Sequence, residues 1–264
     1  MNDRGKHYAL ITGASSGLGK AIVEELAKRG HSLLLVSLPG TGLADQAEIL
    51  ISRYNLPVRY LEADLTRQEA PNEIKRFVSD HNLSVDILVN NVGVGHGGEI
   101  GDYTDETVKE SVMLNVSCTT LMTNAFIKEL KKRERAYLLN IGSFGGFLPM
   151  PYRSIYSATK SYIYFFSLAI RQELRGTNVS VSVAMPGPIL TNNKVRERIM
   201  QQGFISKSNV INPGRAASYI LNMMFRGRGV IIPRWTIRIG YGIASLTPYR
   251  VLLAVLGRLF KGIN

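Results

Sequence analysis

The sequence of 264 residues contains a single cysteine, Cys118, and no acidic residue after Glu197. One cysteine cannot form an internal disulfide, which argues against a secreted, disulfide-held domain and favours a reducing compartment. The N-terminal residues lack the apolar core of a signal peptide, and no run reaches the roughly 18 apolar residues that span a membrane. These absences predict a cytoplasmic protein.

The missing acidic residues leave a strongly basic C-terminal quarter. The net charge is +12, and ten cationic residues follow Glu197. They are consistent with a solvated basic surface, or with attraction to an anionic membrane, an acidic acyl carrier or a phosphate-bearing substrate. Because these cations are not interleaved with an aromatic stacking surface, we expect no nucleic-acid partner.

Short apolar runs alternate with longer stretches of helical periodicity. The predicted strands are 8–11, 32–37, 58–62, 87–89, 137–141, 179–184 and 229–232, and the predicted helices are 18–29, 43–54, 69–80, 107–132, 154–175 and 214–225. Several of the strands are apolar throughout, which is typical of strands buried on both faces of a parallel sheet. The pattern predicts an α/β fold, a Rossmann-like doubly wound parallel sheet of about seven strands with helices on both faces. We expect residues 1–232 to form one domain and residues 233–264 a C-terminal extension of it.

A glycine-rich turn, Thr-Gly-Ala-Ser-Ser-Gly-Leu-Gly, follows the first predicted strand and opens the first predicted helix. Its glycines allow a tight turn and a close approach of phosphate, and the helix N-terminus offers N–H groups to a pyrophosphate. The second strand ends at Ser37 with no acidic or basic residue beside it. Because a missing carboxylate removes repulsion against a 2′-phosphate, we expect NADP(H) to be preferred, with NAD(H) as the alternative. The candidate cofactor-binding residues in this half are Gly13, Ser15, Ser16, Gly17, Leu18, Gly19, Ser37, Asp64, Leu65, Asn91, Val92 and Gly93.

Tyr156 and Lys160 are four residues apart, so a helix places them on one face, and Ser143 lies thirteen residues before Tyr156. A phenol, an ammonium and a hydroxyl together can move a proton to or from an alcohol oxygen. Beside a nucleotide that accepts or gives a hydride, they indicate a reversible carbonyl reduction.

These motifs, in this order and over about residues 6–192, resemble the short-chain dehydrogenase/reductase family. The matching residues are the glycine turn, Asp64-Leu65, Asn90-Asn91-Val92-Gly93, Asn115, Ser143, Tyr156, Lys160, Pro186-Gly187 and Thr191. The resemblance implies that Tyr156 is the general acid or base, that Lys160 stabilises its phenolate and binds the nicotinamide ribose, that Ser143 holds the substrate oxygen, and that Asn115 supports a water-linked proton path.

The resemblance also implies that Thr191 and the backbone of Pro186-Gly187 orient the nicotinamide carboxamide, that Ile189 binds the cofactor as well, and that residues 191–212 form a substrate lid. It implies a homodimer or homotetramer built on the helices that contain Asn124 and Tyr162, and no metal site. Two residues depart from the family pattern. Gly142 replaces a common second serine, which should affect packing more than chemistry, and Val92 replaces the usual alanine and should crowd the cofactor slightly.

The C-terminal extension resembles that of family members that act on steroids, retinoids or sphingoid ketones at membranes. Trp235 and Tyr241, flanked by arginines, suit a lipid–water boundary, and the apolar stretch 251–260 is too short to span a bilayer. Thr247-Pro248 should interrupt any continuous helix. Contact with lipid and contact with a partner subunit explain this segment equally well. The expected substrate is a long-chain 3-keto lipid or a steroid-like ketone; the alternatives are a 3-ketoacyl-carrier or coenzyme A thioester reductase, and a non-catalytic nucleotide-binding scaffold.

Overall fold

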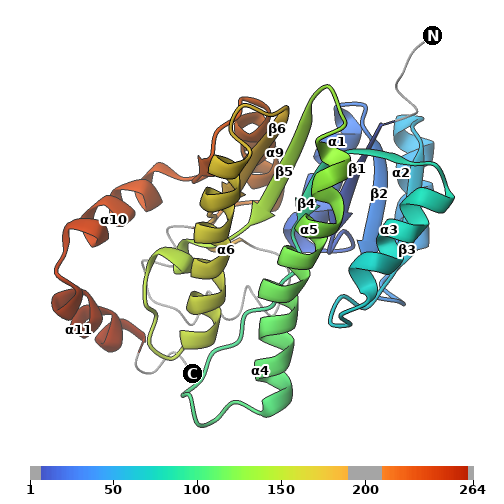
Figure 1. Ribbon diagram of the computed structural model, residues 1–264. Coiled ribbons are helices and arrows are strands. Elements are labelled where there is room, and N and C mark those ends of the chain that lie inside the picture. The colour runs from blue at the N-terminus through green and yellow to red at the C-terminus, as the bar shows by residue number, and fades with distance from the viewer. Residues whose placement is uncertain (1–6, 190–209, 261–264) are drawn as a thin grey trace.

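The computed structural model describes residues 7–189 and 210–260. Its centre is a seven-stranded sheet in the order β3-β2-β1-β4-β5-β6-β7 (Figure 1), and every neighbouring pair is parallel. The strands are β1 (His7–Thr12), β2 (Ser32–Ser37), β3 (Val58–Glu62), β4 (Ser84–Asn90), β5 (Ala136–Ile141), β6 (Val179–Ala184) and β7 (Val230–Ile231). This confirms the predicted doubly wound α/β fold. The strand order reverses between β1 and β4, and the crevice at their carboxyl ends is where such sheets bind ligands.

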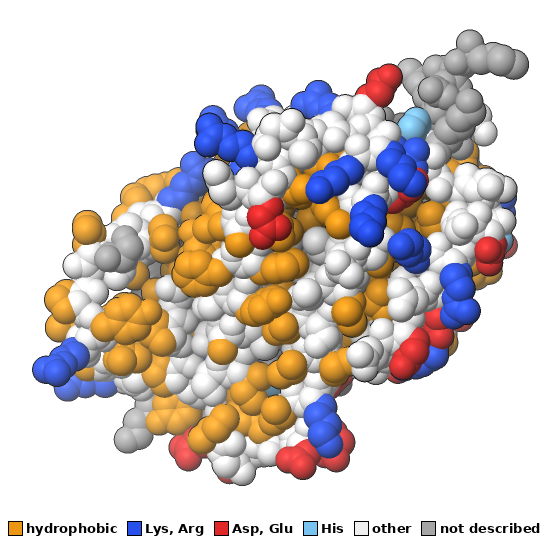
Figure 2. All heavy atoms as spheres, in the orientation of Figure 1, with side chains coloured by type: hydrophobic (Ala, Val, Ile, Leu, Met, Phe, Trp, Pro, Cys, Tyr) orange, Lys and Arg blue, Asp and Glu red, His pale blue; other side chains and the backbone are white. Residues whose placement is uncertain are grey.

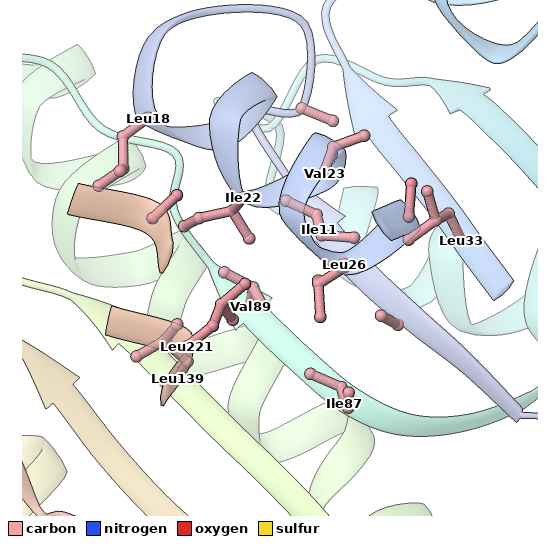
Figure 3. Close-up of a cluster of buried hydrophobic side chains, with 14 of the residues drawn as sticks. Ile11, Leu18, Ile22, Val23, Leu26, Leu33, Ile87, Val89, Leu139 and Leu221 are labelled. Atoms are coloured by element: carbon pink, nitrogen blue, oxygen red, sulfur yellow. The ribbon is translucent and has the colours of Figure 1, made fainter. Parts of the chain in front are cut away.

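Helices cover both faces of the sheet (Figure 1). The helices α1 (Gly17–Lys28), α2 (Leu43–Tyr54) and α9 (Pro213–Phe225) cover one face, and α3 (Ala70–Asp80), α5 (Thr119–Leu130) and α6 (Ser154–Glu173) cover the other. Successive side chains of β1 point to opposite faces of the sheet. Ile11 packs with residues of α1, α2 and α9, as Figure 3 shows for α1, and Leu10 packs with residues of α3 and α5. The apolar runs in the sequence therefore reflect strands buried on both sides.

The single helix predicted over residues 107–132 is wrong in detail. The structure has three segments there: α4 (Asp105–Val112), the π-helix η2 (Met113–Cys118) and α5. Thr104 caps α4, since its side-chain oxygen accepts a hydrogen bond from the Thr107 N–H at 3.2 Å. The π-helix contains Asn115, and its widened turn coincides with the contacts that this side chain makes.

The C-terminal segment forms two helices, α10 (Trp235–Leu246) and α11 (Tyr249–Phe260), which stand beside α6 as an arm (Figure 1). They are separated at Thr247-Pro248, as predicted, because proline disfavours the helical conformation of the residue before it. Ile237 and Leu256 are buried, whereas Trp235 and Ile243 are exposed. None of the described helices is both long and apolar enough to cross a membrane.

Candidate active site

The glycine turn between β1 and α1 forms a cradle that only glycines can form. Gly13 and Gly17 have φ angles of 64° and 55°, in the left-handed region. A β-carbon at residue 19 would lie 2.0 Å from the Gly13 carbonyl oxygen. The missing side chains therefore let the first turn of α1 approach the strand end, with the N-terminal amides of the helix at the cradle. This space and these donors fit the pyrophosphate of a dinucleotide.

Asn91 fixes the cradle to the end of β4. Its side-chain nitrogen donates to the carbonyl oxygens of Thr12 and Gly13 at 3.0 and 3.1 Å, and its backbone N–H donates to the Thr12 hydroxyl at 3.0 Å. Both side-chain N–H groups are thus used inside the protein, so Asn91 positions the turn. Asn90, the first residue of the same motif, lies in the core instead. It is 2 % exposed, and its amide donates to Thr123 and Asn140 within the core.

At the carboxyl end of β2, the side-chain oxygens of Ser15 and Ser37 lie 2.7 Å apart. The hydroxyl of Ser37, a predicted cofactor-binding residue, is therefore joined to the glycine turn. A carboxylate that the sequence reasoning missed lies close by: Glu62 pairs with Ser37 in the sheet register, and its Oε1 accepts a hydrogen bond from the Gly40 N–H at 3.1 Å. The strand pairing of β2 with β3 is the signal that would have revealed it.

Asp64 follows β3, and its Oδ1 accepts hydrogen bonds from the backbone N–H and the hydroxyl of Thr66 at 2.9 and 2.8 Å. These contacts give the carboxylate a role in the turn, and its contact with the cofactor stays a prediction. The neighbouring Leu65 is buried in the apolar cluster on the α3 side of the sheet.

Lys160 is buried on α6, with 6 % of its surface exposed. Its Nζ donates a hydrogen bond to the Ile141 carbonyl oxygen at 3.0 Å. Burial lowers the pKa of Lys160 from 10.5 to about 8, because the low-dielectric surroundings disfavour the charged form. The pKa of Lys160 therefore lies close to neutral pH, and the side chain is one helical turn from Tyr156.

Tyr156 lies between two glycines. β-Carbons at Gly95 and Gly145 would lie 3.2 and 3.3 Å from carbons of the Tyr156 ring, so both positions leave room for the phenol. The Gly145 N–H donates to Oγ of Ser143 at 3.2 Å, and a β-carbon at residue 145 would lie 3.6 Å from that oxygen. Gly145 thus brings Ser143 beside the ring of Tyr156. The guanidinium of Arg153 lies 5.1 Å from the ring centroid.

Asn115 is held on three sides. Its Oδ1 accepts from the Val94 N–H at 2.9 Å, and its Nδ2 donates to the Val94 carbonyl oxygen at 2.9 Å and to the Thr159 hydroxyl at 3.0 Å. A β-carbon at Gly93 would lie 2.6 Å from Oδ1 of Asn115 and 3.1 Å from Nζ of Lys160. The structure therefore brings the four predicted catalytic residues together around Gly93 and Gly145.

Two supporting residues escaped the sequence reasoning. The Thr159 hydroxyl accepts a hydrogen bond from Asn115, which links the π-helix η2 to α6. It also donates a hydrogen bond to the Tyr156 carbonyl oxygen at 2.9 Å. Arg153 lies three residues before Tyr156, and this helical spacing is a signal that could have indicated their contact. Within the described ranges, no group of three or more His, Cys, Asp and Glu side chains could hold a metal ion.

The two departures from the family pattern have structural counterparts. A β-carbon at Gly142 would lie 2.4 Å from the Met185 sulfur, so Met185 fills the space of a serine side chain there. Val92 is partly buried against the cluster on the α3 side of the sheet.

The segment after β6 begins the expected carboxamide site. Pro186 is buried, and its carbonyl oxygen accepts from the Phe144 N–H at 2.8 Å. Gly187 is partly exposed, and Ile189 pairs with Ile211 in an isolated bridge. Thr191 and most of the expected lid lie outside the described residues. Asn212, at the end of the expected lid, instead caps α9 by accepting from the N–H groups of residues 214 and 215.

The chain matches the short chain dehydrogenase family over residues 7–202. It therefore belongs to this family, and it is an oxidoreductase that acts on alcohol and ketone groups. The fold of the family binds NAD(P).

Similar proteins include a reductase of a long-chain substrate. The chain is 30% identical over 242 residues to the very-long-chain 3-oxoacyl-CoA reductase of Mus musculus, covering 86% of this chain and 76% of the relative. A short-chain dehydrogenase from Sphingobium yanoikuyae, solved in complex with NADPH, is 29% identical with a TM-score of 0.76 and covers 92% of this chain and 96% of its own. The bulky-bulky ketone specific alcohol dehydrogenase from Comamonas testosteroni is 27% identical with a TM-score of 0.73, covering 91% of this chain and 94% of its own.

Proposed function

We propose that this protein uses NADP(H) to interconvert a ketone and an alcohol on an apolar substrate, a long-chain 3-keto lipid or a steroid-like ketone. The observation that carries the proposal is the convergence of Asn115, Ser143, Tyr156 and Lys160 beside the glycine cradle. The name of the mouse relative, a very-long-chain 3-oxoacyl-CoA reductase, supports the long-chain class.

In this proposal the bound nicotinamide gives or accepts the hydride, and the side chains of the protein handle the proton. Ser143 holds the substrate oxygen, and the Tyr156 hydroxyl gives that oxygen a proton in reduction or removes it in oxidation. The buried Lys160 ammonium stabilises the phenolate that remains after the proton is given. Asn115, fixed by Val94 and Thr159, supports a proton path through Lys160.

The preference for NADP(H) is supported by the end of β2, where Ser15 and Ser37 offer hydroxyls to a 2′-phosphate and β2 itself carries no carboxylate. Glu62 is the group that opposes it, because a carboxylate beside a 2′-phosphate repels it. We expect tighter binding of NADPH than of NADH in a fluorescence titration, and a larger difference in the Glu62→Gln variant. Preference for NADH in both proteins would reverse the assignment.

A 3-oxoacyl thioester is a second candidate substrate, favoured by the mouse relative and by the basic C-terminal quarter. A thioester brings an anionic carrier or coenzyme A close to the protein, and cations attract either one. Turnover of the thioester with little turnover of the free keto lipid would select this candidate. Tight nucleotide binding without turnover on any ketone would instead support a non-catalytic scaffold.

We further propose that residues 233–264, an extension of the same domain, contact an anionic membrane. Hydrophobic side chains gather over α10 and α11, with basic side chains at the edge of the arm (Figure 2). On α10 the exposed residues Trp235, Ile239, Ile243 and Leu246 recur at helical spacing and form one apolar stripe. An apolar stripe bordered by arginines is typical of helices that lie in the membrane surface.

We also propose that the protein forms a homodimer or homotetramer through α5 and α6. Tyr162 on α6 is exposed, and its hydroxyl lies 3.0 Å from that of Thr120 on α5. Exposed aromatic residues on a helix face suit a subunit contact. The molecular mass in solution would distinguish a homodimer or homotetramer from a monomer.

The central test replaces the proton donor. We expect Tyr156→Phe to lower turnover of a long-chain ketone by a factor of about 10² or more while NADPH binding is kept, because the ring remains and only the hydroxyl is lost. Turnover is followed by NADPH oxidation and binding by fluorescence. Unchanged turnover would refute the role of Tyr156.

A further inference from the structure

An apolar groove of about 500 Å³ lies between the segment that follows β5, the outer face of α6, and the arm of α10 and α11. Phe147, Met150, Tyr164, Phe165, Tyr241 and Leu253 are among its walls. None of its lining residues carries a charge. Such a surface accepts an uncharged chain and disfavours an ionic head group, which would lose its hydration there.

The wall between the arm and the body is held by aromatic contacts. The ring centroid of Phe147 lies 4.2 Å from the ring centroid of Tyr241 on α10 and 4.9 Å from that of Tyr164 on α6. Ile237 of α10 is buried with Ile163 and Met185 in a small cluster at the carboxyl end of the sheet. These contacts join the groove to the edge of the sheet that carries the catalytic residues.

Met150 lies where the groove comes near the phenol of Tyr156. Met150 lines the groove, and its sulfur would lie 2.8 Å from a β-carbon at Gly145. The same β-carbon would lie 3.3 Å from a carbon of the Tyr156 ring, so Met150 and the ring approach Gly145 from neighbouring positions. Methionine is unbranched and adapts its rotamer readily, so this side chain can move aside without a change in the backbone.

We propose that this groove binds the aliphatic chain of the substrate whose carbonyl reacts at Tyr156, with the chain passing Met150. The inference rests on the proposed function and names the part of the site that selects chain length. The size of the groove lies within the range of small-molecule sites. Its outer wall is α11. The apolar stripe on α10 belongs to the same arm, so an arm that lies on a lipid surface would place the groove beside the lipid chains.

The test compares two substitutions on α11 that introduce the same charge. Leu253 lines the groove, and Val255 does not; both are partly exposed, at 42% and 49%. Ala158→Trp, at an exposed groove position of α6, gives a second, uncharged obstruction. We expect Leu253→Glu and Ala158→Trp to lower kcat/KM for a long-chain ketone by about tenfold or more relative to a short ketone, and Val255→Glu to leave the ratio unchanged.

Binding of a fluorescent long-chain alcohol to the full-length protein gives a second readout that needs no turnover. Leu253→Glu and Ala158→Trp should weaken it about tenfold and Val255→Glu should not. The proposal would be overturned if the variants kept the wild-type ratio of kcat/KM for the long-chain ketone to kcat/KM for the short ketone. It would also be overturned if all variants bound the probe equally. No ketone turnover by the wild-type protein, with groove-dependent probe binding, would instead refute the proposed reaction and retain the chain site.

Discussion

The burial of Lys160 predicts an unusual dependence of stability on pH in the cofactor-free protein. The pKa of this side chain is lowered from 10.5 to about 8 by desolvation. The folded state is therefore penalised wherever the lysine is charged. Between pH 8 and pH 10.5 the unfolded chain binds more protons than the folded one, so the free energy of unfolding must rise with pH in that window.

The size of the effect follows from the two pKa values. A shift from 10.5 to about 8 corresponds to a limit of about 3 kcal/mol. Between pH 7 and pH 9.5 the contribution of Lys160 to the free energy of unfolding should rise by about 2 kcal/mol. For a chain of this length that is a shift in Tm of about 4 °C.

Lys160→Met removes this contribution and keeps most of the side-chain volume. It also leaves the Ile141 carbonyl oxygen without its donor, which lowers stability by about 1–3 kcal/mol at every pH. The difference in slope therefore reflects the titration, whereas the offset combines the lost hydrogen bond with the removed desolvation penalty. Lys128→Met, on the exposed surface of α5, is the matched control and should follow the wild type.

The measurement is the Tm of wild type, Lys160→Met and Lys128→Met from pH 7 to pH 9.5 without nucleotide. We expect the wild type and Lys128→Met to gain about 4 °C relative to Lys160→Met over this range. Parallel profiles for all three proteins would show that Lys160 is not desolvated, and would refute the argument.

Two further predictions concern the cradle and the arm. Gly19→Ala should abolish dinucleotide binding and lower stability by about 1–3 kcal/mol, because its β-carbon would lie 2.0 Å from the Gly13 oxygen. Gly101→Ala, with nothing near its β-carbon, should change neither dinucleotide binding nor stability. If Gly19→Ala bound the dinucleotide as tightly as the wild type, the cradle would not be the dinucleotide site. Ile239→Asp should weaken sedimentation with anionic vesicles, whereas Ile49→Asp on α2, with the same 52% exposure, should not. Equal sedimentation of both variants with the wild type would assign the stripe to a subunit contact.

The sequence predicted the central strands of the sheet well because they are buried on both faces. Strand β2 was predicted at both ends, and all six of its residues are buried, so its apolar run has no exposed alternation to confuse it with a loop. The end of β7 was harder to predict, since only Val230 and Ile231 pair in the sheet and Val230 is partly exposed. Burial on both faces made the central strands recognisable, whereas β3, whose residues are mostly exposed, was also predicted at both ends.

The residues on the cofactor side of the candidate site could be proposed from the sequence, but the contacts among them could not. Asn90 and Asn91 are adjacent in the sequence, yet alternation along β4 sends one side chain into the core and the other to the glycine turn. Glu62 and Ser37 are 25 residues apart and meet only because β3 pairs with β2. The groove beside α6 depends on how the arm packs, and no local spacing encodes that.

The π-helix shows why a helical pattern can be right and still miss the functional geometry. The apolar residues around Asn115 fit one regular helix, and that is what periodicity predicted. Asn115, however, must reach both the Val94 backbone and Thr159 on α6, while Gly93 leaves just enough room for its carbonyl oxygen. A polar side chain buried between apolar neighbours needs all of these partners, because each unpaired group there lowers stability by about 1–3 kcal/mol. The widened turn of η2 coincides with the residue whose buried amide makes these contacts, the same residue to which the proposed reaction assigns the proton path.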